Sequence, residues 1–61
     1  MTILAWVRFK IEQTENYSTV DSTADAIYNK TLELTNNDHS AMFATEMYLA
    51  GVNQKLKNKA I

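Results

Sequence analysis

Titratable side chains, the residues that could perform acid–base chemistry, are few and scattered in this chain of 61 residues. General acid–base catalysis needs such groups to converge in a cleft. His39, the single histidine, follows an expected helix cap, where a solvated side chain is ordinary. The carboxylates fall mainly at expected turns, caps and exposed helical positions: Glu12, Glu15, Asp21, Asp25, Glu33, Asp38 and Glu46. We therefore expect no catalytic residues and no enzyme.

Metal and cofactor sites are equally unsupported by the residue types. The chain has no Cys, which removes disulfides and thiolate ligands together. Asp38 and His39 are adjacent, but Glu46 lies too far along the chain to complete a preformed ligand set. Gly-rich phosphate loops, nucleophile elbows and HExxH motifs are absent from the sequence. We expect no metal, no cofactor and no small-molecule substrate.

Charge and hydropathy narrow the class of partner. The net charge is −1, so the protein as a whole has no basic field to attract nucleic acid or anionic lipid. The apolar stretch 3–7 is too short for a membrane span or a signal peptide. We therefore expect a cytoplasmic protein that does not associate with membranes and is unlikely to bind nucleic acid.

The first element that must position any site is the stretch 2–13, which reads TILAWVRFKIEQ. Strict alternation with β-branched and aromatic residues predicts a β-strand with one face in a core. One face carries Ile3, Ala5, Val7, Phe9 and Ile11, and the other carries Leu4, Trp6, Arg8, Lys10 and Glu12. A strand needs a partner for its backbone groups. The partner is either a returning strand at 17–20, which would form a β-hairpin, or a second protein molecule.

A first helix is expected to begin at Asp21 or Ser22, because Ser22 with Asp25 three residues later resembles a capping box. The run Asn36-Asn37-Asp38 should end this helix and start the next, since Asn tolerates the left-handed αL backbone and Asp is a good N-cap. The second helix is expected over 39–57. The predicted fold is one small α+β domain over 1–61, with an N-terminal strand or hairpin followed by two antiparallel helices.

The second helix carries two apolar stripes, where a surface helix normally needs one. The main stripe is Ala41, Met42, Thr45, Tyr48, Leu49, Val52 and Leu56. Phe43, Met47 and Ala50 form a second cluster on nearly the opposite side, and Gly51 between the stripes predicts a close backbone approach. Large apolar residues of these types are enriched at protein interfaces.

We therefore predict a protein-binding surface made of Phe43, Met47 and Ala50 with Leu4 and Trp6 from the back of the strand. The partner would be a second copy in a homodimer or a different protein. The alternative is that one helix covers each face of the sheet, so that a single monomer buries all of these side chains.

The order strand, helix, helix at this length resembles the ribbon-helix-helix repressors. That resemblance implies a dimeric DNA-binding regulator whose paired strands enter the major groove. Trp6, Arg8 and Lys10 would be the outward, base-facing set. The chain departs from the pattern in its negative net charge and in having Asn36-Asn37 where a Gly is usual between the helices.

The preferred reading is a small non-catalytic protein-interaction module. Chains this short without a catalytic motif are often inhibitors, antitoxins or phage-encoded modulators that bind and block a host protein. The ribbon-helix-helix DNA-binding regulator is the alternative.

Overall fold

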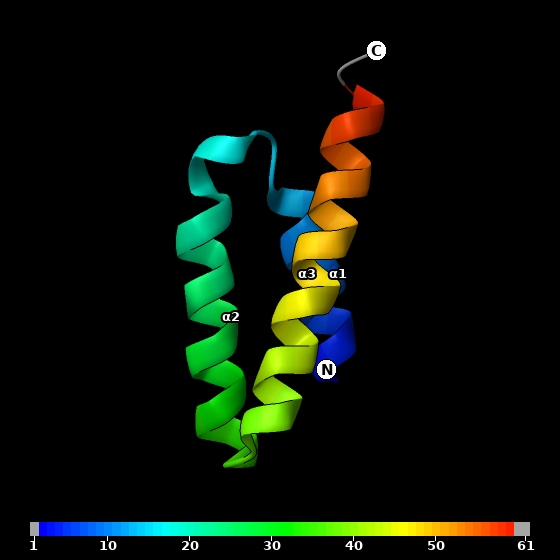
Figure 1. Ribbon diagram of the computed structural model, residues 1–61. Coiled ribbons are helices and arrows are strands. Elements are labelled where there is room, and N and C mark those ends of the chain that lie inside the picture. The colour runs from blue at the N-terminus through cyan, green and yellow to red at the C-terminus, as the bar shows by residue number, and fades with distance from the viewer. Residues whose placement is uncertain (1, 60–61) are drawn as a thin grey trace.

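The computed structural model describes residues 2–59, and these residues form three α-helices and one short 3-10 turn. The elements are α1 (Ile3–Gln13), the 3-10 turn η1 (Tyr17–Thr19), α2 (Val20–Thr35) and α3 (Asp38–Lys59). The helices run up, down and up, so that α1 and α3 point in the same direction and α2 in the opposite one (Figure 1). No β-strand occurs between residues 2 and 59, and the predicted α+β fold is wrong.

The stretch predicted to be a strand is α1, because its apolar residues also fit a helical period. Ile3, Val7 and Ile11 recur at a spacing of four; Val7 is almost fully buried, and Ile3 and Ile11 pack against the core. The Thr2 hydroxyl caps the first turn by accepting from the Ala5 N–H at 3.1 Å. A helix satisfies its own backbone groups, whereas a strand here would have needed a partner.

The predicted returning strand at 17–20 is also wrong. Tyr17–Thr19 is the turn η1, and Val20 opens α2 and enters the core. The side chain of Asn16 holds this turn by accepting from the Ser18 N–H at 2.9 Å. Residues 14–16 therefore lead from α1 into η1 and α2, and they do not connect two strands.

Helix α2 starts earlier than predicted and ends where predicted. Ser22 lies inside the first turn, and its hydroxyl donates to the Thr19 carbonyl at 3.1 Å, so it is not the first residue of a capping box. At the other end, Asn36 has φ 50° and ψ 36°, the left-handed conformation, and its N–H donates to the Leu32 carbonyl at 2.8 Å. The prediction that Asn terminates this helix in the αL region is confirmed.

Helix α3 begins one residue before the predicted start and continues to Lys59. Its cap is Asn37, whose side-chain oxygen accepts from the Ser40 N–H at 3.1 Å, while the predicted cap, Asp38, is the first helical residue. Lys57 and Lys59 lie in the last turn, where cations favour the helix dipole.

The core lies along α3, which contacts both other helices (Figure 1). Its buried members are Val7, Val20, Ala24, Ile27, Ala44, Tyr48, Val52 and Leu56. A Cβ built on Gly51 would overlap the Ile11 side chain of α1, so the close approach at this glycine is made by a side chain and not, as predicted, by a backbone. None of the helices within residues 2–59 is long and apolar enough to cross a bilayer.

Candidate functional site

The most distinctive surface of the molecule is an apolar face shared by α1 and α3. Leu4 of α1 lines one hollow together with Phe43 and a neighbouring hollow together with Met47. Leu4, Phe43 and Met47 therefore lie side by side, although Leu4 and Phe43 are 39 positions apart in the chain. We call these three residues the α1/α3 face.

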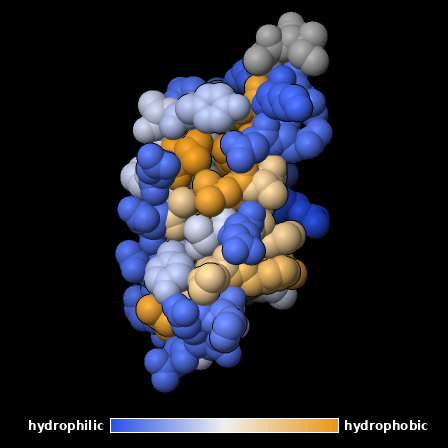
Figure 2. Space-filling view, viewed as in Figure 1, coloured by the Kyte–Doolittle hydropathy of each residue, from blue (hydrophilic) through white to orange (hydrophobic). Residues whose placement is uncertain are grey.

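The three side chains of the α1/α3 face are about half exposed to solvent, although all three are apolar. Leu4 is 52% exposed, Phe43 55% and Met47 43%, whereas Tyr48, next to Met47 on the same helix, is completely buried. Scattered apolar residues are normal on a protein surface, but contiguous ones are characteristic of binding sites. Figure 2 looks at a different side of the molecule, where further apolar residues gather over α3 and its boundary with α2 and hydrophilic residues flank them.

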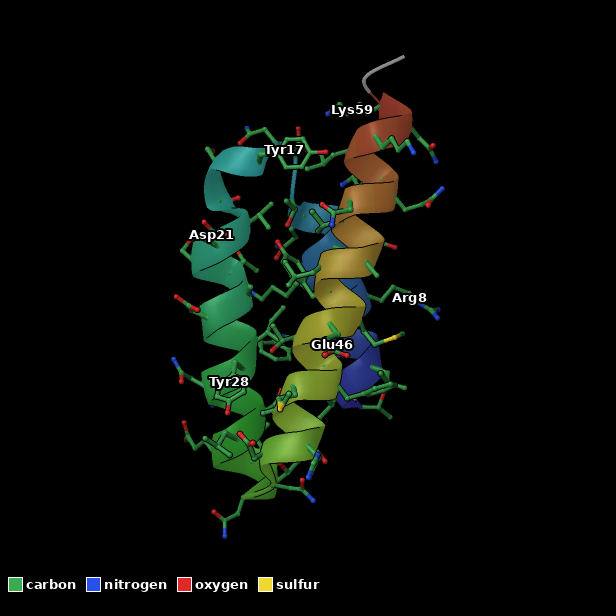
Figure 3. The ribbon with its side chains drawn as sticks, viewed as in Figure 1. Arg8, Tyr17, Asp21, Tyr28, Glu46 and Lys59 are labelled. Carbon is green, nitrogen blue, oxygen red and sulfur yellow. The ribbon has the colours of Figure 1, made fainter. Side chains whose placement is uncertain are left out.

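Ala50 and Arg8 extend and border this face. Ala50 is exposed and lies about one helical turn beyond Met47, as the sequence predicts. Arg8 lines the same hollow as Leu4 and Met47, and in Figure 3 its side chain extends outward on the side of α3 away from α2. The face therefore has an apolar centre with one cationic side chain at its edge.

Trp6 lies elsewhere, although a strand would have placed it beside Leu4. In a helix, positions two apart point about 200° away from each other. Trp6 instead lines a groove of about 190 Å³ with Ile3, Lys30 and Leu34, between α1 and α2. The Lys10 ammonium stands 5.9 Å from the centroid of its ring. The part that Leu4 and Trp6 play in partner binding remains a prediction, and the two residues line different hollows.

The residues predicted to read DNA are also separated by the helix. Trp6 and Lys10 are four residues apart and neighbours on the α2 side, whereas Arg8 borders the α1/α3 face. The paired strands that ribbon-helix-helix proteins insert into the major groove have no counterpart in residues 2–59. Trp6, Arg8 and Lys10 therefore do not form the continuous outward row that this alternative requires.

The position of α1 against α3 depends on polar contacts at the C-terminal end of α1. The Thr14 hydroxyl donates to the Lys10 carbonyl at 2.8 Å. The Tyr48 hydroxyl is hydrogen-bonded to the same Thr14 hydroxyl at 2.7 Å. The Lys55 ammonium donates to the carbonyls of Ile11, Glu12 and Thr14 at 3.1, 2.7 and 2.8 Å. These contacts fix the relative position of the two helices and hence the shape of the α1/α3 face.

Sequence reasoning missed the role of Lys55, which was not among the predicted site residues. One signal was present, because Lys55 is seven residues after Tyr48 and therefore lies on the same side of α3. A cation there can reach the C-terminal carbonyls of a neighbouring helix, which attract positive charge.

Titratable groups are spread over the surface. All seven carboxylates and His39 are exposed. The Tyr28 hydroxyl donates to Asp38, and this hydrogen bond, with minor contributions from desolvation and the Asp38 charge, raises the pKa of Tyr28 above its usual value. No group of three or more metal-ligating side chains is close enough within residues 2–59 to hold a metal ion.

No family model, no curated protein and no solved structure matches the chain. The arrangement of the side chains is therefore the basis for any statement about function.

Proposed function

We propose that this chain is a small non-catalytic interaction protein that binds another protein, in the first instance a second copy of itself, through the α1/α3 face. The observation that carries the proposal is the gathering of Leu4, Phe43 and Met47, each about half exposed, from two helices onto one surface. A partner protein would cover this surface, whether it inhibits this chain or is inhibited by it. We expect the contact to be made in the cytoplasm, the compartment that the sequence predicts.

The energy available from the face sets the extent of the contact. Full burial of a large apolar side chain contributes about 1.5–3 kcal/mol, so covering the exposed half of one contributes roughly 1 kcal/mol. Three such side chains give roughly 3 kcal/mol, which is below the cost of association. The face is therefore the apolar centre of a wider contact, to which Ala50 adds area and Arg8 a charged edge that orients an acidic partner group.

The proposal is tested by the substitution Phe43→Asp, compared with Met42→Asp as a matched control. Both residues are apolar, neighbouring on α3 and similarly exposed, at 55% and 46%, but Met42 does not line the hollows of the α1/α3 face. A carboxylate in a desolvated apolar contact costs several kcal/mol, so Phe43→Asp should weaken association on the order of 100-fold. Met42→Asp should associate like the unmodified chain.

Association is measured by sedimentation over a range of protein concentrations, and folding by circular dichroism. A concentration-dependent dimer that Phe43→Asp dissociates while remaining helical supports the proposal. If the unmodified chain is monomeric at every concentration, the unmodified chain, Phe43→Asp and Met42→Asp are each used to capture proteins from lysate. This comparison decides whether the face binds a different partner. Association that is the same for Phe43→Asp and the unmodified chain in both assays would show that the face is not the binding surface.

A further inference from the structure

A small crevice opens where the first turn of α1 lies over the end of the bundle formed by α2 and α3. Figure 1 shows the turn between α2 and α3 extending past the start of α1. The crevice has a volume of about 180 Å³. Ile3, Leu4 and Phe43 form apolar walls, and the nearly buried Ala44 and Thr31 form the floor. Since Leu4 and Phe43 belong to the α1/α3 face as well, the crevice is continuous with that face.

The floor contains a polar group that lacks a partner. Thr31 is 1% exposed, and its hydroxyl has no hydrogen-bond partner among residues 2–59. The carbonyl of the same residue is occupied, because the Thr35 hydroxyl donates to it at 2.7 Å. A buried unpaired hydroxyl is unfavourable and rare in folded proteins. Such a group beside an open crevice leaves room for a partner atom that enters from outside.

We propose that this crevice receives a neutral aromatic side chain with a hydrogen-bonding tip, a Tyr or a Trp, from the protein that docks on the α1/α3 face. This inference rests on the proposed function. A cavity of about 150 Å³ with apolar walls is large enough for a benzene ring, so a crevice of about 180 Å³ suits one aromatic side chain. None of the described lining residues is charged, so a charged tip would be buried without compensation.

The Thr31 hydroxyl selects the tip of the incoming side chain. A hydroxyl can donate or accept, and it therefore fits a phenol O–H as well as an indole N–H. Rotation about the Cα–Cβ bond of Thr31 exchanges its hydroxyl and methyl groups, and both rotamers are accessible to Thr in a helix. Because Thr31 lines the crevice, this rotation is the movement by which its buried hydroxyl would reach the incoming tip. Phe or Leu would fill the space equally well but would leave the hydroxyl unpaired.

The test uses p-cresol and indole as probes of the Tyr and Trp side chains, with toluene as the probe that lacks a hydrogen-bonding group. Binding to the full chain is followed by NMR chemical shifts, with dissociation constants expected in the millimolar range. In Thr31→Val, the preference for p-cresol over toluene should fall about fivefold, the size of one net hydrogen bond. Thr45→Val is the matched control, because Thr45 is half-buried on α3, bonded to the Ala41 carbonyl and outside the crevice, so it should leave the preference unchanged.

Ser40→Leu supplies an independent variant, because Ser40 lines the crevice and a larger side chain there should displace all three probes. Probe binding that persists in Ser40→Leu, or a preference that is the same in Thr31→Val and the unmodified chain, would overturn the inference.

The outcome is separable from that of the proposed function. If association depends on Phe43 but the preference does not depend on Thr31, this inference alone is wrong. If the preference depends on Thr31 but association ignores Phe43, the occupant is a free small molecule and not a partner's side chain.

Discussion

Two buried threonines, at opposite ends of the bundle, show how differently the same residue can be used. Thr14 is 5% exposed and Thr31 is 1% exposed. The Thr14 hydroxyl donates to the Lys10 carbonyl and therefore accepts from the Tyr48 hydroxyl, so both of its roles are filled. The Thr31 hydroxyl has neither kind of partner among the described residues. Burial alone therefore does not show whether a polar group holds a fold together.

The difference follows from what surrounds each residue. Thr14 stands just after α1, where helix-end carbonyls need donors, and α3 brings both Tyr48 and Lys55 to that point. Thr31 lies within α2 and faces a crevice that is mostly apolar. One end of the bundle is thus closed by a completed hydrogen-bond network, and the other contains an unpaired hydroxyl beside an open crevice.

The largest effect should come from breaking the completed network at Thr14. Thr14→Val removes the acceptor of the fully buried Tyr48 hydroxyl and should lower the free energy of unfolding by about 2 kcal/mol. Tyr48→Phe should cost only about 1 kcal/mol, because Thr14 keeps its bond to Lys10. The double variant should therefore be more stable than Thr14→Val alone. Urea unfolding of the three variants checks this order, and simple additivity of the two losses would contradict it.

A somewhat smaller effect is expected at Lys55. Its ammonium donates to three carbonyls at the end of α1, but the side chain is partly exposed and solvent screens part of the interaction. Lys55→Met should lower the free energy of unfolding by about 1.5 kcal/mol. Lys57→Met, two residues along and exposed, is the control and should change it by less than about 0.5 kcal/mol. Equal losses in the two variants would show that net charge, and not the contact with α1, is what matters.

The smallest effect should have the opposite sign. Thr31→Val replaces an unpaired buried hydroxyl with a methyl group of similar size and should raise the free energy of unfolding by about 1 kcal/mol. Differential scanning calorimetry should accordingly show a higher melting temperature. A loss of stability would mean that the hydroxyl already has a partner in solution, such as a bound water, and that the two threonines are less different than their contacts indicate.

The two helices after residue 19 followed from the sequence to within two residues at each end, although their N-caps were misassigned. Asn36 ends α2 in the left-handed conformation as predicted, and the main stripe of α3 supplies Tyr48, Val52 and Leu56 to the core. Stretch 2–13 was misassigned because it is so rich in apolar residues that both a period of two and a helical period fit it. The apolar pattern of the stretch does not distinguish a strand from a helix, and packing against α3 does.

The candidate site was only partly predictable for the same reason. Phe43 and Met47 are four apart on a helix that was correctly assigned, so their common exposure could be anticipated. Leu4 was predicted to join them, but with Trp6 beside it, and α1 directs Trp6 toward α2 instead. The unpaired hydroxyl of Thr31 depends on how three helices meet, which no pattern within one segment encodes.

The placement of Trp6 gives the molecule an internal optical reporter. It is the single tryptophan of the chain, it lies in the groove between α1 and α2, and Lys10 stands over its ring. Its fluorescence therefore responds to whether α1 is docked, whereas most of the far-ultraviolet circular dichroism comes from the longer helices α2 and α3. When the two signals change together, the bundle melts as one cooperative unit; when the fluorescence changes first, α1 leaves a helical hairpin that is still intact.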